Sequence, residues 1–267
     1  MTGYRKSVRG QRRVWGFGLL LAALLAAGGA ARAQEGKELR VAAASDLQPV
    51  MPVLADMYLK KTGVKLLVNF GSSGALATQI ENGAPVDLFL GADFTYPEKI
   101  VAAGLADAKA PTAYARGRLA VWARKDSPLQ PISMDKLMDP RIQRIAVADP
   151  LHAPFGRAAA AALDRMKMLD ALKPKLVVAE NVAQAGQFVE SGNAQAGLIS
   201  LTLASSQRYM ELGSYAVVPD SQYPEIRQTA VVLRKSNRRA EAHAFLDWLL
   251  SSEIQGKLPR VGMDAVR

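Results

Sequence analysis

The chain has 267 residues, 49% of them hydrophobic and 22% charged, a composition typical of a globular protein with room for two modest domains or one large one. It has no cysteine and two histidines, which excludes disulfides, thiolate metal sites, cysteine nucleophiles and a histidine-rich metal centre. The net charge of +10 comes without a dense basic patch interleaved with aromatic residues, so nucleic acid is not an expected partner.

Residues 1–33 have the layout of a secretory signal peptide. A basic start precedes an apolar run, and Ala31-Arg32-Ala33 forms a small-x-small cleavage site. The apolar run is shorter than the roughly 20 residues that span a bilayer, which favours a cleaved signal over a membrane anchor. We expect cleavage near Ala33-Gln34 and a periplasmic location. Removal of the six basic residues of this segment lowers the net charge from +10 to +4.

After the signal, short apolar runs alternate with helical patterns. Strands are predicted at residues 39–44, 64–70, 86–91, 119–124, 145–148, 176–179, 196–199 and 230–233. Helices are predicted near residues 50–61, 75–82, 155–168, 182–191, 240–250 and 252–258. The order βαβαβ occurs twice, which predicts two α/β units, each with parallel strands covered by helices.

Four of the predicted strands are followed directly by residues that favour the start of a helix. Ser45 and Gln48 have the spacing of a capping box, and a run of small residues, Gly71-Ser72-Ser73-Gly74, follows the second strand. Pro154 suits the first position of a helix and leaves the amide of Phe155 free. Asn181 is a good N-cap for a helix that begins at Val182.

Helix starts of this kind offer unpaired N–H groups and the positive end of the helix dipole. In open α/β sheets, ligands bind beyond the carboxyl ends of the strands. Two helix starts from each unit would therefore face one cleft. Serine hydroxyls add directed donors, so the pattern predicts a site that binds a small oxyanion without a salt bridge.

Four runs carry a resemblance to a known family: VAAASDL (41–47), NFGSSGALATQIENGAPVDLFLGAD (69–93), IAVADPLHAPFGRAA (145–159) and PKLVVAENVAQAGQFVESGNAQAG (174–197). They resemble the molybdate-binding proteins of ABC importers, and the likeness extends from residue 38 to about residue 262. The resemblance implies a two-lobed α/β fold of periplasmic binding protein type II, with a mixed sheet flanked by helices in each lobe. Residues 34–117 and 227–267 would form lobe 1, and residues 118–226 would form lobe 2.

The same resemblance implies a binding protein rather than an enzyme, with molybdate or tungstate as its ligand and an ABC membrane permease as its partner. It implies no cofactor, no side chain that ligates a cation directly, and a monomer. Carried over by position, Ser45 and Ser73 would donate hydroxyls, and Phe155 and Val182 would donate backbone N–H groups. Many relatives have a tyrosine where this chain has Ser200, which makes Ser200 the candidate fifth donor.

Two residues near Ser45 complicate the first turn. Asp46 would repel an anion if it faced the cleft, and we expect it to cap the helix instead. Pro52 lies too deep for a helix that starts at Ser45, so we expect that helix to start late or to kink.

Three other functions are compatible with parts of the sequence. The ligand could be sulfate or phosphate, and phosphate would need an acceptor such as Asp46 for its proton. A ferric or organic ligand is also possible, although the tyrosines are scattered. A serine hydrolase is suggested by the S-x-x-K run at 133–136 and by the K-T-G run at 61–63, but their order is reversed. The K-T-G run is better explained as a helix that ends at glycine.

Overall fold

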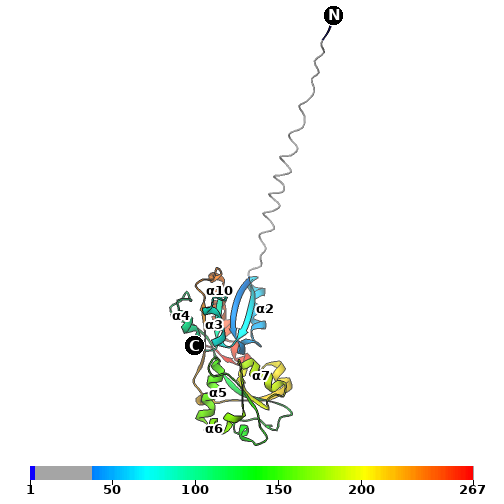
Figure 1. Ribbon diagram of the computed structural model, residues 1–267, viewed down its shortest axis with the longest axis vertical. Helices are drawn as coiled ribbons and strands as arrows, with labels where there is room; N and C mark the ends of the chain where they lie inside the picture. Colours follow the sequence, from blue (N-terminus) through cyan, green and yellow to red (C-terminus); the bar gives the residue numbers. More distant parts are fainter. Residues whose placement is uncertain (4–37, 267) are drawn as a thin grey trace. The chain divides into compact units, whose positions relative to one another are not determined.

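The computed structural model describes residues 1–3 and 38–266, and the chain from Glu38 onward forms one compact unit. The predicted signal peptide, apart from its first three residues, lies outside the described residues. In the described part of the chain, no helix is long and apolar enough to cross a membrane. The compact unit contains two sheets, each with its own helices (Figure 1).

The first sheet has six strands in the order β11-β4-β10-β3-β1-β2. Its strands are β1 (Glu38–Ala44), β2 (Lys65–Gly71), β3 (Leu88–Gly91), β4 (Thr112–Gly117), β10 (Ile226–Val232) and β11 (Met263–Asp264). β1 is parallel to β2 and β3, whereas β10 is antiparallel to β3 and β4, so the sheet is mixed. The helices of this part are α2 (Met51–Thr62), α3 (Ser73–Glu81), α4 (Thr95–Ala102), α10 (Arg239–Leu250) and α11 (Ser252–Gln255).

The first sheet is buried on both faces. Val41 and Ala43 of β1 belong to an apolar cluster with Phe245, and Ala42 between them belongs to a second cluster with Phe89. Successive residues of a strand point to opposite faces, so a strand covered on both sides reads as a continuous apolar run. This burial explains why β1 and β3 could be recognised in the sequence.

The second sheet has five strands in the order β7-β6-β8-β5-β9. Its strands are β5 (Leu119–Arg124), β6 (Ile145–Ala148), β7 (Leu176–Ala179), β8 (Ala196–Ser200) and β9 (Gly213–Val217). β6 is parallel to β7 and β8, and β5 is antiparallel to β8 and β9. The helices are α5 (Pro154–Arg165), α6 (Leu169–Leu172), α7 (Val182–Glu190), α8 (Leu201–Ala204) and α9 (Gln207–Leu212), and one core surrounds the fully buried Trp122.

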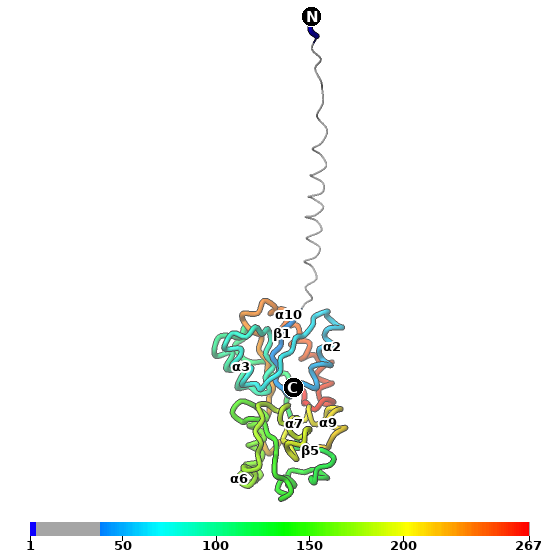
Figure 2. The backbone as a smooth tube through the Cα atoms, turned by 45° about the vertical axis from the view of Figure 1, so that its right-hand side comes forward, coloured from blue at the N-terminus to red at the C-terminus, as the bar shows by residue number. Residues whose placement is uncertain are grey.

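The chain passes between the sheets twice, at Arg118 and again between β9 and β10. The first sheet therefore takes its strands from both ends of the described chain, and the second from the middle. In Figure 2 the blue-to-cyan segments from residue 38 onward and the orange-to-red C-terminal segments share one part, and green and yellow segments fill the other. We keep residues 34–117 with 227–267 and residues 118–226 as the proposed boundaries of the first and second lobes.

The predicted strands at 119–124, 145–148 and 176–179 coincide with β5, β6 and β7. β4 and β9 were not predicted, because half or more of the residues in each strand are partly exposed and neither strand is a continuous apolar run. The first helix does start late, as Pro52 predicted, because a short 3-10 turn (η1, Ser45–Leu47) precedes α2. The capping box was wrong, since the N-cap of this turn is Ala44 and no side chain caps it.

The start of α5 lies against the end of β6, and Gly156 is the residue that permits this contact. A Cβ at Gly156 would lie 2.3 Å from the Ala148 carbonyl oxygen, which is closer than packed atoms can come. Gly156→Ala should therefore displace the helix start and lower the free energy of unfolding by about 1–3 kcal/mol, the usual cost of overpacking. Urea denaturation checks this, and an unchanged unfolding midpoint would contradict it.

Candidate functional site

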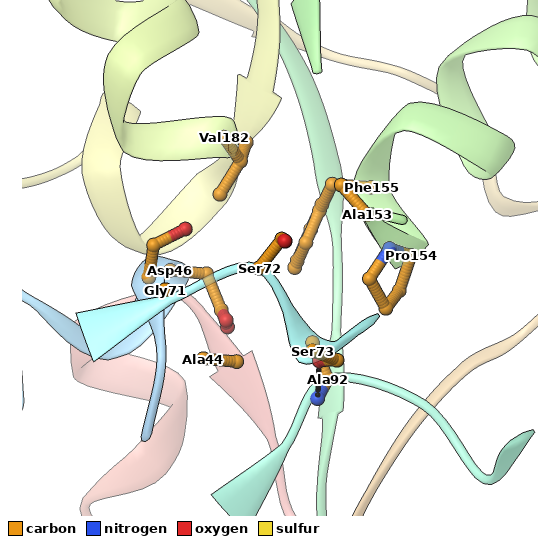
Figure 3. A pocket seen from close by; sticks show the side chains of 11 residues that line it. Ala44, Asp46, Gly71, Ser72, Ser73, Ala92, Ala153, Pro154, Phe155 and Val182 are labelled. Carbon is orange, nitrogen blue, oxygen red and sulfur yellow. Dashed lines mark hydrogen bonds between the residues drawn. The ribbon is translucent and has the colours of Figure 1, made fainter. Parts of the chain in front are cut away.

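A cavity lies where segments that follow the two sheets meet (Figure 3). Five segments line it: the end of β1 with η1, the β2–α3 turn, the residue after β3, the start of α5 and the start of α7. The lining residues are Ala44, Ser45, Asp46, Gly71, Ser72, Ser73, Ala92, Ala153, Pro154, Phe155 and Val182. This lining contains no lysine or arginine, so an anion here would be held by dipoles and hydrogen-bond donors.

The first lobe supplies hydroxyl groups whose protons remain available. Ser73 Oγ accepts a hydrogen bond from the Ala92 N–H at 2.9 Å, which leaves its own proton to donate. Ser45 is buried, and within the described residues its hydroxyl forms no hydrogen bond. Ser72 is the N-cap of α3 and accepts weakly from the Ala75 N–H at 3.4 Å, while its hydroxyl points toward Phe155 in Figure 3.

The second lobe supplies backbone N–H groups. Phe155 and Val182 lie in the first turns of α5 and α7, where no carbonyl of the same helix can accept their N–H groups. Asn181 caps α7, as predicted, by accepting from the two N–H groups that follow Val182, at 3.1 and 3.0 Å. The cap therefore leaves the Val182 N–H as the donor that remains, and both residues line the cavity.

The structure thus brings together Ser45, Ser73, Phe155 and Val182 around one cavity, and it does not bring Ser200 there. The Ser200 hydroxyl lies 2.8 Å from the Thr202 hydroxyl, which itself donates to the Asp46 carbonyl at 2.6 Å. Because the single proton of Thr202 is used in that bond, the Ser200 proton must point to Thr202. Ser200 thereby supports a contact between the lobes.

Asp46 is the one acidic residue in the lining, and it is completely buried. It does not cap the turn as expected. Its Oδ2 accepts a hydrogen bond from the Gln228 side-chain amide on β10, and its Oδ1 has no partner among the described residues. Burial raises the pKa of Asp46 to about 7, and the bond from Gln228 offsets only part of this effect.

Sequence reasoning missed Ser72 as a lining residue and Gln228 as the partner of Asp46. The hydroxyl of Ser72, next to Ser73, was visible in the sequence but indistinguishable from a helix cap, a role that it also fills. Gln228 lies 182 residues from Asp46, and no local pattern links the two positions. The S-x-x-K and K-T-G runs are not brought together: Ser133 lies in the second lobe, and K-T-G ends α2 at Gly63, which has a left-handed φ of 73°.

Comparison with known proteins identifies the family of the chain. The family model described as bacterial extracellular solute-binding protein matches residues 39–264. Molybdate-binding proteins of Azotobacter vinelandii and Escherichia coli are 36% and 31% identical to the chain. These matches cover 86% and 89% of the chain, and 90% and 92% of the two relatives.

Solved structures give the same result. The periplasmic molybdate-binding protein of Azotobacter vinelandii superposes with a TM-score of 0.78 at 29% identity, over 86% of this chain and all of that one. A sulfate-binding protein of Mycobacterium tuberculosis has a TM-score of 0.71 at 16% identity, over 86% of this chain and 87% of that one, and shows the shared fold alone.

The fold is that of a two-lobed periplasmic binding protein of type II, as expected from the sequence. The chain belongs to the bacterial extracellular solute-binding proteins and, among them, to the family of the molybdate-binding proteins.

The raised pKa of Asp46 predicts how stability depends on pH. Between about pH 4 and pH 7 the folded protein retains a proton on Asp46 that the unfolded chain, with a pKa of 3.8, has released. The contribution of Asp46 to the free energy of unfolding is therefore fully present below pH 4 and is lost as the pH rises toward 7. The loss is at most about 4 kcal/mol, at about 1.4 kcal/mol per pKa unit.

Asp46→Asn keeps an oxygen for Gln228 and removes this titration. Urea unfolding of both proteins should be measured from pH 4 to pH 8. The free energy of unfolding of the variant should rise relative to that of the wild type up to pH 7, and the difference should stay constant above pH 7. Asp135→Asn, at an exposed position, serves as the control. Parallel profiles over the whole range would show that Asp46 does not titrate as described.

Proposed function

We propose that the protein captures molybdate, and comparably tungstate, in the cavity between the lobes and delivers it to an ABC permease. The observation that carries this proposal is the ring of donors: two serine hydroxyls from one lobe and two helix-start N–H groups from the other, without a cationic side chain. Such a ring suits a fully deprotonated tetrahedral oxyanion, which needs donors from several directions and no acceptor.

The proposal also includes export of the protein and delivery of its ligand to a membrane permease. The amino-terminal sequence predicts a cleaved signal peptide, and the relatives at 31–36% identity are molybdate-binding proteins. A relative from Bacillus subtilis, 27% identical, is described as an ABC transporter substrate-binding lipoprotein. We infer a periplasmic monomer that binds its ligand reversibly and has no catalytic step.

A protonated oxyanion such as phosphate is the alternative that one observation favours. The Oδ1 of the buried Asp46, which has no partner among the described residues, could accept a hydrogen bond from the proton of such a ligand. Against this, the same burial raises the pKa of Asp46 and favours its neutral form, which would donate to the anion instead. We therefore retain molybdate as the ligand, and titration with several anions decides between the two.

Isothermal calorimetry with molybdate, tungstate, sulfate and phosphate tests the choice of ligand. Molybdate and tungstate should bind with similar affinity. Sulfate should bind at least tenfold more weakly, because a smaller anion cannot reach all four donors at once; tenfold corresponds to about 1.4 kcal/mol. Equal binding of sulfate would contradict the selectivity, and preferential binding of phosphate would establish the alternative.

Removal of one hydroxyl donor tests the site. Ser73→Ala and Ser45→Ala should each weaken molybdate binding by roughly ten- to a hundredfold, since a hydrogen bond to a charged group contributes about 1.5–3 kcal/mol. Ser191→Ala, which removes an exposed hydroxyl at the end of α7, should leave the affinity unchanged. Wild-type affinity in both cavity variants would show that these serines do not hold the ligand.

A further inference from the structure

Direct contacts join the two lobes beside the cavity, and we call this group of contacts the rim. The Gly74 N–H of α3 donates to the His152 carbonyl at 2.9 Å, and the Tyr96 hydroxyl of α4 donates to the Leu151 carbonyl at 2.7 Å. A Cβ at Gly74 would lie 2.8 Å from the Tyr96 ring and 2.9 Å from the His152 carbonyl oxygen. The absence of a side chain at Gly74 therefore allows the lobes to meet here.

An ion pair lies on the same rim. The Arg157 guanidinium of α5 pairs with the Asp93 carboxylate, whose side chain is only 12% exposed, and lies over the Tyr96 ring at 5.3 Å from its centroid. Asp93 is itself fixed, because its Oδ1 accepts from the Tyr96 N–H at 3.2 Å and its carbonyl accepts from the Thr229 hydroxyl at 2.7 Å. Arg157 thus reaches from the second lobe to a rigid acceptor on the first.

The ion pair links the two segments that carry the anion donors. Arg157 lies two residues after Phe155 on α5, and Asp93 follows Ala92, whose N–H donates to the Ser73 hydroxyl. Neither Arg157 nor Asp93 is among the residues that line the cavity. The pair can therefore set the distance between the lobes without contacting the anion.

We propose that Arg157 is a positioning residue which, with Asp93 and Tyr96, forms a rim latch that holds the lobes closed and raises the affinity for every oxyanion by the same factor. This inference rests on the proposed function. The apparent dissociation constant of a ligand equals its intrinsic value divided by the fraction of closed protein. A group that touches only the other lobe changes that fraction and leaves the ratio between ligands unchanged.

Arg157→Gln should raise the dissociation constants of molybdate, tungstate and sulfate alike, by about tenfold, which corresponds to about 1.4 kcal/mol. The change should appear in the dissociation rate, measured by stopped-flow competition, with the association rate unchanged. Arg157→Lys keeps the charge but loses the planar group over Tyr96, and should be intermediate. Arg165→Gln is the matched control, because this arginine of the same helix bonds the Ser221 carbonyl away from the rim.

A double-mutant cycle tests the partner. Asp93→Asn should weaken binding by a similar factor, and the double variant should be no weaker than either single variant, because one interaction is lost in each case. Additive losses would overturn the pairing. Unchanged affinity in Arg157→Gln would overturn the latch, and so would a changed molybdate-to-sulfate ratio, since it would show that Arg157 acts on the anion itself.

Different results would contradict the proposed function and the latch. If the wild-type protein binds none of the oxyanions, the proposed function is wrong, and small-angle X-ray scattering in anion-free buffer then decides the latch. A larger radius of gyration for Arg157→Gln than for the wild type supports it, and equal radii overturn it. Melting temperatures of all variants identify any that do not fold, and the Arg157 series remains informative without Asp93→Asn.

Discussion

An oxyanion that is buried without a cationic side chain has to be held by donors whose protons are not used elsewhere in the protein. Helix starts meet this condition, because their first N–H groups have no carbonyl one turn earlier. Parallel strands that lead directly into helices place such starts at the same edge of a sheet. The two sheets supply three such helix starts, those of α3, α5 and α7, together with the 3-10 turn that carries Ser45. The local hydrogen bonds meet the proposed requirement: Asn181 caps its helix yet leaves the Val182 N–H free, and the Ser73 hydroxyl accepts from the Ala92 N–H so that its proton remains.

The turn that places Ser45 at the cavity also buries the Asp46 carboxylate, which is unfavourable for stability. A buried carboxylate is destabilising unless it is neutral or paired. Gln228 donates one hydrogen bond to it, and burial raises its pKa to about 7, so a proton can remove the charge near neutral pH. Its backbone is useful at the same time, since the Asp46 carbonyl accepts from Thr202 of the other lobe.

The parts of the site that could be predicted from sequence are those governed by local rules. Ser73, Phe155 and Val182 follow recognisable strand ends, and the strands β5, β6 and β7 were located to the residue. That these residues bind the ligand is a proposal. The long-range pairings could not be predicted, because Arg157 and Asp93 are 64 residues apart and Asp46 and Gln228 are 182 apart. Only the fold determines such contacts.

The proposed binding site and the proposed latch share single helical turns. On α3, Ser73 faces the cavity and the next residue, Gly74, donates to the other lobe at the rim. On α5, Phe155 offers its N–H to the cavity and Arg157, two residues later, reaches the rim. In the proposed mechanism, an anion that draws the two helix starts together also brings the rim contacts into range, and the rim contacts hold the donors at the spacing the anion needs. The proposed division of roles is that the cavity selects the ligand and the rim adds a closing free energy that does not depend on which ligand is bound.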